Sequence, residues 1–258
     1  LPPFRATELD GSDWQRHCLR GGYPRSFLAD DDVASYQWRQ DYIRTFLERD
    51  IPQLGFNIPA NTLGRLWRML AHVNGQTLNS AKLADSMGVS ANTIRKYIDL
   101  LEQTFVLRTL PPFAGNTRIR LVKSPKVYIR DTGLLHALLD IERFDDLFAH
   151  PAYGASFEAY VVENILSALP DWRASFYRTS NGAELDLVLE KGQRRVAVEV
   201  KASTAPKVSK GFWQAIEDAH AAWENRGRLT ADDVERFRGM KARADERAAQ
   251  TGAEAEHA

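Results

Sequence analysis

The stretch from Ala183 to Ser203, AELDLVLEKGQRRVAVEVKAS, constrains the fold more than any other part of the chain. Its two halves largely alternate between apolar and polar residues, which predicts two β-strands. Gly192-Gln193 lies between the halves and predicts a two-residue hairpin turn. One face carries leucines and valines, namely Leu185, Leu187, Leu189, Val196, Val198 and Val200. The other face carries the charged residues Glu184, Asp186, Glu190, Glu199 and Lys201.

The predicted register brings two carboxylates together, because a turn at 192–193 places Asp186 directly opposite Glu199. Paired residues have Cβ atoms about 5 Å apart, and carboxylates that close repel unless a cation lies between them. Hard divalent ions take such oxygen ligands, so we predict a Mg²⁺ or Mn²⁺ site formed by Asp186, Glu199 and the carbonyl of Val200. Lys201 projects from the same face, and this combination is typical of metal-dependent phosphodiester cleavage.

The same hairpin also has a less specific interpretation. The register places Glu184 opposite Lys201, which an ordinary surface hairpin uses as a cross-strand ion pair. Glu-x-Lys alone is a weak signal, whereas the whole hairpin preceded by a helix that carries Glu158 is more specific. The pattern therefore predicts a nuclease-like fold and leaves catalysis as a hypothesis.

The size and charge balance of the chain limit its organisation and its partners. Its 258 residues are enough for two domains with separate cores. Lys+Arg and Asp+Glu are equal at 34 each, so a nucleic-acid contact must come from local charge. The single cysteine, Cys18, cannot form an internal disulfide, which suits a reducing cytoplasm. We expect it to be a small residue of the core. No membrane-length apolar run or signal peptide is visible, so we expect a cytoplasmic protein without a membrane partner.

Changes in pattern along the chain predict four regions. These are a helical N-terminal segment at 1–60, a winged helix-turn-helix domain at 61–142, a strand-rich domain at 150–218 and a helical or disordered tail at 219–258. The loop-rich stretch 143–151 is the expected boundary between the two domains. The predicted class is therefore α+β to α/β.

Helix start and stop signals between residues 80 and 102 predict the helix-turn-helix. A short helix ends at Gly88, and Ser90 caps a second helix over 91–102. Predicted strands at 105–107 and 126–129 flank a loop and complete a winged-helix plan. The exposed face of the second helix, which such a fold presents to DNA, carries Thr93, Arg95 and Lys96.

The local charge beside this motif favours contact with an anion. From Gln103 to Arg130 there is no acidic residue, while six cations occur, namely Arg108, Arg118, Arg120, Lys123, Lys126 and Arg130. This basic stripe fits phosphate contacts by a wing, so Arg118, Arg120 and Lys123 are predicted DNA-binding residues. The alternative is a protein-protein module in which the basic strand pairs with an acidic partner.

Two further helices are predicted around the domain boundary. The pattern at 131–139 predicts a short helix that buries His136 as a hydrogen-bonded core residue. The helix after Tyr153 has the spacing to bury Phe157, Val161, Ile165 and Ala168, with Glu158 at the edge of this stripe. A strand at 175–179 precedes the hairpin, and this order is expected for a small mixed sheet with its site at a helix-sheet junction.

Several blocks from about Gly21 to Gly211 resemble the C-terminal portion of a prokaryotic AAA-type ATPase family, labelled domain of unknown function 4143. The resemblance is carried by GGYPR at 21–25, DYIRTFLERDIPQLG at 41–55, the helix-turn-helix at 80–102, KVYIRDTGLLHALL at 126–139, GASFEAYVVENIL at 154–166 and the ELD…VEVKAS hairpin. It implies an ATPase-lid-like segment, a winged helix and a restriction-endonuclease-like mixed-sheet domain of the PD-(D/E)xK type. By the same resemblance Glu158 is the helix carboxylate, Asp186 and Glu199 hold the metal, and Lys201 is the catalytic lysine.

The chain departs from that family in two places. It contains no G-x-x-x-x-G-K-[ST] motif, so it has no ATP site of that kind. The tail after Ala219 does not continue the strand-and-helix pattern that completes the nuclease-like domain. The leading hypothesis is a DNA-binding, Mg²⁺- or Mn²⁺-dependent DNA-cleaving module. The alternative is a non-catalytic DNA-binding or protein-interaction module that accompanies an ATPase domain or subunit.

Overall fold

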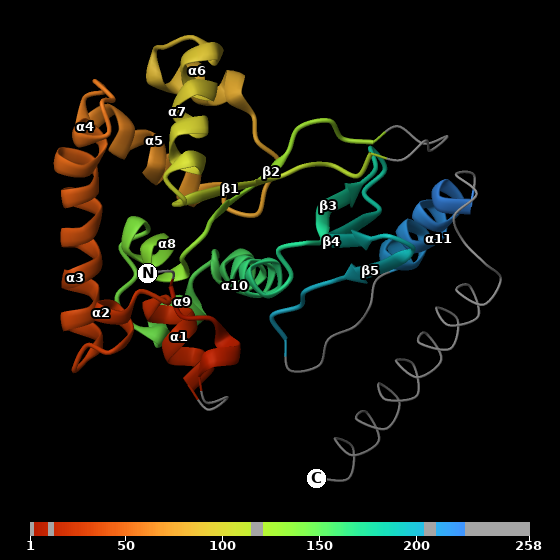
Figure 1. Ribbon diagram of the computed structural model, residues 1–258, viewed down its shortest axis with the longest axis horizontal. Coiled ribbons are helices and arrows are strands. Elements are labelled where there is room, and N and C mark those ends of the chain that lie inside the picture. The colour runs from red at the N-terminus through yellow and green to blue at the C-terminus, as the bar shows by residue number, and fades with distance from the viewer. Residues whose placement is uncertain (1–2, 10–12, 115–120, 204–209, 225–258) are drawn as a thin grey trace. The chain divides into compact units, whose positions relative to one another are not determined.

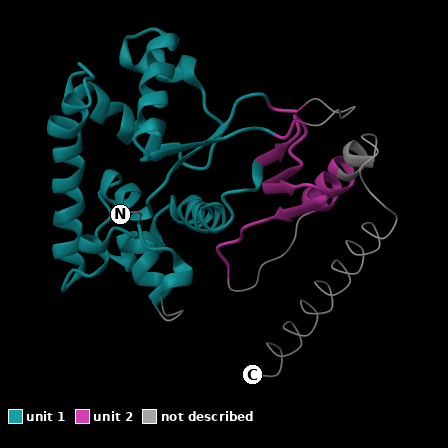
Figure 2. Cartoon of the chain, viewed as in Figure 1, with its two compact units in different colours: residues 1–112, 123–174 teal, residues 113–122, 175–258 magenta. Residues whose placement is uncertain are grey.

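The chain divides into two compact units in the computed structural model, which describes residues 3–9, 13–114, 121–203 and 210–224 (Figure 2). Unit 1 comprises Leu1–Pro112 and Lys123–Ala174, and unit 2 comprises Phe113–Val122 and Ser175–Ala258. The expected boundary at 143–151 lies inside unit 1. The helix that follows it therefore belongs to unit 1, whereas the hairpin belongs to unit 2.

Unit 1 is mainly helical (Figure 1). Its α-helices are α1 (Trp14–Arg20), α2 (Pro24–Phe27), α3 (Asp32–Thr45), α4 (Ile51–Gln53), α5 (Ala60–His72), α6 (Ser80–Met87), α7 (Ala91–Gln103), α8 (Thr132–Leu138), α9 (Phe144–Ala149) and α10 (Tyr153–Ala168). A short 3-10 turn, η1 (Ala6–Glu8), precedes them, and a π-helical turn, η3 (Phe46–Asp50), joins α3 to α4. Two strands, β1 (Leu107–Leu110) and β2 (Lys126–Ile129), pair antiparallel.

The predicted boundaries of α6 and α7 are confirmed by the structure. Helix α6 ends at Gly88, whose φ of +68° is the left-handed conformation that glycine adopts at a helix end. Ser90 caps α7, because its Oγ accepts a hydrogen bond from the Thr93 amide at 3.1 Å. Between α5 and α6, Thr77 forms an antiparallel bridge with Lys126 of β2.

The predicted start of the strand at 105–107 is wrong, because β1 begins at Leu107. Phe105 has a φ of +61°, and the amides of Phe105 and Val106 donate to the carbonyls of Glu102 and Leu101. This is the hydrogen-bond pattern that closes a helix, with the left-handed position occupied by Phe105 in place of the usual glycine. A side chain there costs roughly 1 kcal/mol or more. Strand β1 consequently begins only at Leu107.

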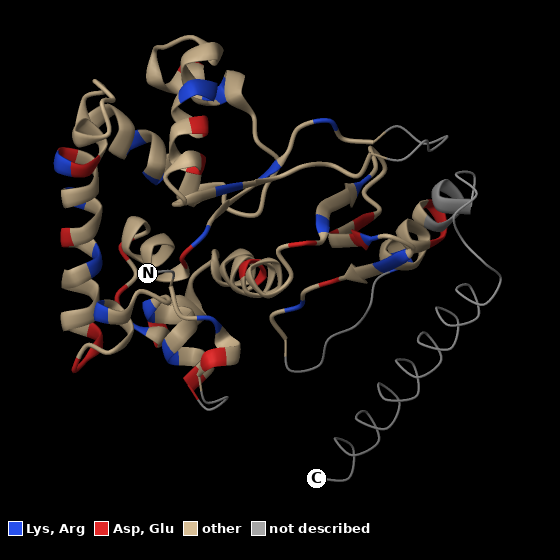
Figure 3. Cartoon of the chain, in the orientation of Figure 1, with Lys and Arg blue, Asp and Glu red and all other residues tan. Residues whose placement is uncertain are grey.

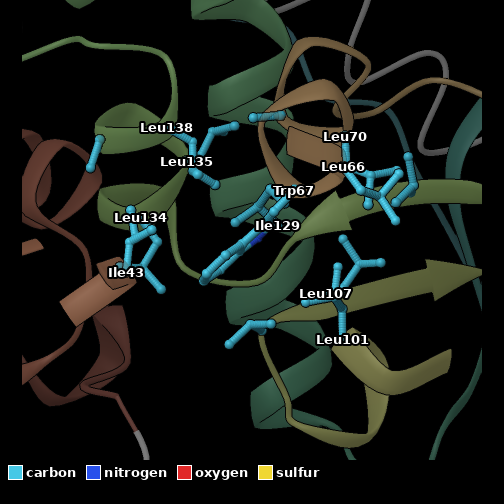
Figure 4. Close-up of a cluster of buried hydrophobic side chains, with 14 of the residues drawn as sticks. Ile43, Leu66, Trp67, Leu70, Leu101, Leu107, Ile129, Leu134, Leu135 and Leu138 are labelled. Carbon is cyan, nitrogen blue, oxygen red and sulfur yellow. The ribbon is translucent and has the colours of Figure 1, made fainter. Parts of the chain in front are cut away.

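The core of unit 1 surrounds Trp67, which is fully buried (Figure 4). Leu66 and Leu70 lie on the same face of α5, and Leu101, Leu107 and Ile129 come from α7, β1 and β2. The apolar residues spaced three or four apart along α5 and α7 are buried, namely Leu63, Leu66, Trp67, Leu70, Ile94, Ile98 and Leu101. The helical period of 3.6 residues places them on one face of each helix.

A buried polar joint connects the end of α1 to the start of α8. The Arg39 guanidinium is completely buried and donates to the carbonyls of Leu19 and Gly133 at 3.2 and 3.0 Å. Asp131 accepts from the Gly22 amide at 2.8 Å and caps α8 through the Leu134 amide at 2.9 Å. A Cβ built at Gly133 would lie 2.1 Å from the Arg20 carbonyl oxygen, so this close approach requires glycine.

His136 is buried and hydrogen-bonded, as predicted. Its Nδ1 lies 2.9 Å from the Leu19 carbonyl, which can only accept, so Nδ1 carries the proton. Its Nε2 then accepts from Ser156 Oγ at 2.6 Å. Burial lowers the pKa of His136 to about 3, so the ring is neutral.

The buried face of α10 differs from the predicted stripe. The residues that are fully buried are Ser156, Ala159, Tyr160, Val162 and Leu166, while Phe157, Val161 and Ile165 are half-buried and Ala168 is exposed. The helix is apolar on more than one side, so periodicity alone did not select the inner face. The contact of the small Ser156 side chain with His136 orients it instead.

Unit 2 is a three-stranded sheet packed on a helix. Its order is β3 (Arg173–Arg178), β4 (Glu184–Lys191) and β5 (Arg194–Val198), and α11 (Lys210–Glu224) packs against β4. Two described residues outside the strands bind β3, since the amides of Phe113 and Val122 donate to the carbonyls of Phe176 and Arg178. The core consists of Phe113, Tyr177, Leu185, Val188, Ala215 and Ala219. The registers given by the structure, β1–β2 and β4–β5, are antiparallel rather than mixed.

Two further expectations concerned membrane-spanning helices and the C-terminal tail. None of the helices in the described ranges is long and apolar enough to cross a membrane. Residues 225–258 of the predicted tail lie outside the described residues.

We predict that His136→Asn weakens the pH dependence of stability. At pH 8 the variant should lose about 1–3 kcal/mol of unfolding free energy, because Ser156 loses its acceptor. Below about pH 6.5 the unfolded histidine binds a proton that the native ring rejects, so the parent loses up to about 1.4 kcal/mol per pH unit and the variant does not. Urea unfolding between pH 8 and pH 4 measures both effects. His72→Asn, at an exposed position, should follow the parent; equal slopes in parent and His136→Asn would contradict the assignment.

Candidate active site

The hairpin has the predicted turn and register. Lys191 pairs with Arg194 and Leu187 with Val198, so the two-residue turn at 192–193 is confirmed. Gly192 has a φ of +59° at the first position of this turn, where glycine is preferred. Continuing the register by one pair beyond β5 places Asp186 opposite Glu199. Both carboxylates lie on the sheet face that also carries Val188 and Ala197, which pack near α11.

Asp186 is held in place by the backbone of the opposite strand. Its side chain is almost completely buried in β4, and Oδ2 accepts a hydrogen bond from the Val200 amide at 2.9 Å. Val200 was predicted as a metal ligand through its carbonyl, and the contact given by the structure is this amide contact.

The two carboxylate oxygens of Glu199 have different surroundings. Its Oε1 accepts from Lys201 Nζ, but Oε2 is buried and has no hydrogen-bond partner among the described residues. Burial raises the pKa of Glu199, the Lys201 hydrogen bond opposes that rise, and the nearby charges of Asp186 and Glu184 add to it. Buried polar atoms without a partner are uncommon in proteins, and Glu199 Oε2 is one of five among the described residues, with atoms of Arg39, Trp67, Ser175 and Arg195.

The oxygen set of the hairpin fits a divalent cation. The two carboxylates supply hard oxygen ligands, and the unpartnered Glu199 Oε2 supplies one that no other group uses among the described residues. In the same residues no three His, Cys, Asp or Glu side chains gather as a metal-binding group. Mg²⁺ commonly binds through one or two carboxylates, with waters and substrate phosphates completing its shell. The two carboxylates are donors of the kind that Mg²⁺ or Mn²⁺ takes, and the metal site stays a prediction.

Lys201 is the exposed end of the site. Its side chain is 41% exposed and pairs with Glu199 on the same strand. Glu184, which the register places opposite Lys201, has its Oε2 3.7 Å from Arg178 Nε. Lys201 therefore neutralises part of the charge of the carboxylate pair while remaining accessible to a ligand.

Glu158, the fourth predicted catalytic residue, makes different contacts. It lies on α10 in unit 1, where its Oε1 accepts from Lys126 Nζ at 3.0 Å and from the Tyr128 hydroxyl at 2.6 Å. The Lys126 side chain is 2% exposed, so this is a buried ion pair between α10 and β2. The contacts give Glu158 a structural function within unit 1.

Part of the basic stripe pairs with acidic residues within unit 1, where Lys and Arg are blue and Asp and Glu are red in Figure 3. Arg108 makes two hydrogen bonds to Glu163 of α10 at 2.7 and 3.0 Å, and Arg130 Nε donates to the same carboxylate at 2.8 Å. With Lys126, three of the stripe's cations pair with acidic residues of α10. Sequence reasoning missed Tyr128 and Glu163, because these partners lie 30 to 55 residues from the groups that they bind.

The remaining predicted DNA-binding residues lie on α7 and in or near the predicted wing. Arg95 and Lys96 are exposed on α7, while Thr93 is half-buried with its Oγ1 2.9 Å from Ser90 Oγ. Lys123 is exposed. Arg118 and Arg120 lie outside the described residues. Of the predicted DNA-binding residues that the structure describes, Arg95, Lys96 and Lys123 are therefore exposed.

Comparison with known families finds two matches in tandem. Residues 11–145 match a domain of unknown function, DUF8612, and residues 153–240 match another, DUF4143. The first match covers just over half of the chain, so this protein belongs to the DUF8612 family. The expected resemblance to DUF4143 is thus confirmed for the C-terminal part. The blocks before residue 145 are matched by DUF8612 instead.

Two curated mycobacterial proteins are similar to this chain. They are uncharacterized protein Mb2031c of Mycobacterium bovis and uncharacterized protein Rv2008c of Mycobacterium tuberculosis, each 43% identical over 222 residues. The similarity covers 86% of this chain and 50% of each relative, so the chain spans about half the length of these relatives. No solved structure matches the chain.

We predict that Lys126→Met destabilises the protein strongly. Removing one member of a buried ion pair leaves the Glu158 charge uncompensated, so unfolding free energy should fall by roughly 3 kcal/mol. The double variant with Glu158→Gln should recover part of that loss. Lys123→Met, at an exposed lysine on the same segment, should change stability by less than about 0.5 kcal/mol. Chemical denaturation of the four proteins measures this, and a Lys126→Met protein as stable as the parent would contradict it.

Proposed function

We propose that this chain is a DNA-binding module that cleaves phosphodiester bonds with the help of Mg²⁺ or Mn²⁺. The observation that carries the proposal is the buried, unpartnered oxygen of Glu199 beside Asp186, with Lys201 at the exposed edge. Two carboxylates forced together are costly in a hairpin that only needs to fold. A divalent cation between the carboxylates would remove their repulsion. Lys201 adds a positive charge that can stabilise the phosphate during cleavage.

Each residue of the hairpin has a defined part in this mechanism. Asp186, oriented by the Val200 amide, and Glu199 hold the cation. When bound, the cation polarises the scissile phosphate and lowers the pKa of a coordinated water. Lys201 can turn from Glu199 to a phosphate oxygen and stabilise the negative charge that develops there. Protonation of Glu199 competes with cation binding, and its raised pKa makes that competition stronger as pH falls.

The order of elements supports the fold assigned to each unit in this proposal. In unit 1 the sequence of α5, the Thr77 bridge, α6, α7, β1 and β2 agrees with a winged helix. The order α10, β3, β4, β5 and α11 agrees with a restriction-endonuclease-like core. Arg95 and Lys96 of the second helix, Thr93 at its capped start, and Lys123, Arg118 and Arg120 around the wing would contact DNA phosphates.

An ATPase is the partner that we propose for the module. The DUF4143 match and the resemblance to an ATPase-associated family support this, and the match covers only 50% of each curated relative. Because the residues of this chain contain no phosphate-binding loop motif, the ATPase activity would come from another domain or subunit. The buried free thiol of Cys18 suits a reducing cytoplasm.

A second candidate function is favoured because several predicted site residues bind other side chains of the same unit. Glu158 is bound by Lys126 and Tyr128, and Arg108 and Arg130 are bound by Glu163. A non-catalytic DNA-binding or protein-interaction module of an ATPase would need none of these groups to be accessible. The two candidates differ in whether the hairpin binds a metal and cleaves DNA.

We predict that the parent nicks supercoiled DNA when Mg²⁺ or Mn²⁺ is added. Asp186→Ala and Lys201→Ala should each lower the rate at least about 100-fold, because they remove a metal ligand and the charge-stabilising group. Arg194→Ala, at the exposed end of the turn, should cleave like the parent. An Asp186→Ala protein that cleaves as fast as the parent excludes the hairpin as the catalytic site. Metal-independent DNA binding without cleavage in the parent supports the second candidate.

We also predict that DNA affinity depends on salt through α7. Each phosphate contact contributes roughly 0.9 to the slope of log affinity against log salt concentration. The double variant Arg95→Gln/Lys96→Gln should therefore lower that slope by about 2. Arg44→Gln, an exposed arginine on α3 that pairs with Asp41, is the matched control and should leave it unchanged. Fluorescence anisotropy with a labelled duplex measures the slope, and an unchanged slope in the double variant removes α7 from the DNA interface.

A further inference from the structure

Unit 1 contains a cavity of about 880 Å³ that the proposed nuclease function does not use. It is bounded by the N-terminal segment, the starts of β1 and α8, the C-terminal half of α10 and Trp172. This volume lies in the range of sites for small molecules and cofactors. Three features of its wall, namely two arginines, an exposed aromatic ring and their mutual contact, point to a class of ligand.

Arg108, Arg130 and Glu163 form a cluster with one positive charge in excess. Both arginines line the cavity and both pair with that one carboxylate, while Arg5, Glu8 and Asp131 are the other charged residues of the wall. Glu163 binds Nε and Nη2 of each arginine and so holds the two guanidinium planes in place. Within the described residues, Nη1 of each arginine makes no hydrogen bond. Two oriented guanidinium groups with donors available are suited to a phosphate or carboxylate.

Phe105 gives the wall an aromatic surface. Its ring is 71% exposed, and it lies at a left-handed backbone position where glycine is the usual residue. The ring is therefore kept at a position that is unfavourable for it and does not fill the core. The Arg130 guanidinium lies 5.7 Å from the ring centroid, which places the aromatic surface beside the cationic pair. Residues held in such conformations concentrate at functional sites.

We propose that this cavity binds a nucleotide, with the base stacked on Phe105 and the phosphate bound by Arg108 and Arg130. Base stacking on an aromatic side chain and phosphate binding by arginine are the two interactions by which proteins recognise nucleotides. The wall offers both side by side. The nucleotide is either a free nucleoside monophosphate or the 5′-phosphorylated end of a single DNA strand, since both present the same chemistry. The site does not depend on the hairpin of unit 2.

Isothermal titration calorimetry of the full chain in EDTA tests the proposal without any contribution from a metal site. We expect adenosine monophosphate to bind, and adenosine and ribose 5-phosphate to bind at least about tenfold more weakly, because each lacks one of the two interactions. Phe105→Gly should weaken binding about tenfold while the melting temperature stays equal or rises, since glycine suits the left-handed position. Arg108→Gln should weaken binding similarly, and Phe148→Ala, an exposed ring outside the cavity wall, should not.

The outcomes separate the alternatives. Competition between adenosine monophosphate and a 5′-phosphorylated oligonucleotide identifies the strand end as the source, and binding of the mononucleotide alone identifies a free nucleotide. Equal binding of ribose 5-phosphate and adenosine monophosphate overturns the proposal in favour of a simple anion site. Unchanged affinity in Phe105→Gly, or no binding of either probe to the parent, also overturns it. None of these results affects the cleavage test of the hairpin, which uses metal and different residues.

Discussion

Unit 1 depends on the burial of the Arg39 guanidinium between the end of α1 and the start of α8. Burying this charge is costly unless its donors find acceptors, and the close approach of the two helix ends supplies two of them, the carbonyls of Leu19 and Gly133. Gly133 permits that approach, Asp131 accepts from the Gly22 amide, and His136 binds the Leu19 carbonyl. Arg39 Nη2 has no partner among the described residues. Arg130 lies between β2 and Asp131 and lines the cavity.

The charges of the two units are used in different ways. In unit 1 the cations of the basic stripe pair with Glu158 and Glu163 of α10, so they contribute to packing between the helix and the strands. In the hairpin of unit 2, by contrast, Glu199 keeps a buried oxygen without a partner among the described residues. Arg39 Nη2 in unit 1 is also buried without a partner among the described residues, so an unsatisfied atom alone does not mark a site. We assign the chemistry to the hairpin because there the unpartnered oxygen belongs to a carboxylate that the register places opposite Asp186 and that pairs with Lys201.

Sequence patterns were reliable where one local interaction decides the conformation. The cap at Ser90, the left-handed end at Gly88 and the turn at Gly192 each depend on a few neighbouring residues, and all three are confirmed. The patterns failed where packing between distant parts of the chain decides the conformation or the buried face. The inner face of α10 differs from the predicted stripe, and the left-handed Phe105 delays β1 beyond the predicted start.

The sequence by itself determined the helices around the turn at Gly88 and the hairpin register that places Asp186 opposite Glu199. These follow from periodicity and from hydrogen bonds between residues close in the chain. The burial of His136 was also predicted, but its partners Leu19 and Ser156 lie 117 and 20 residues away and were found only in the structure. Only the tertiary structure decided which charges are neutralised, since Lys126 lies 32 residues from Glu158 and Arg108 lies 55 residues from Glu163. Composition and spacing carry no information about such pairs, because packing alone brings their side chains within hydrogen-bonding distance.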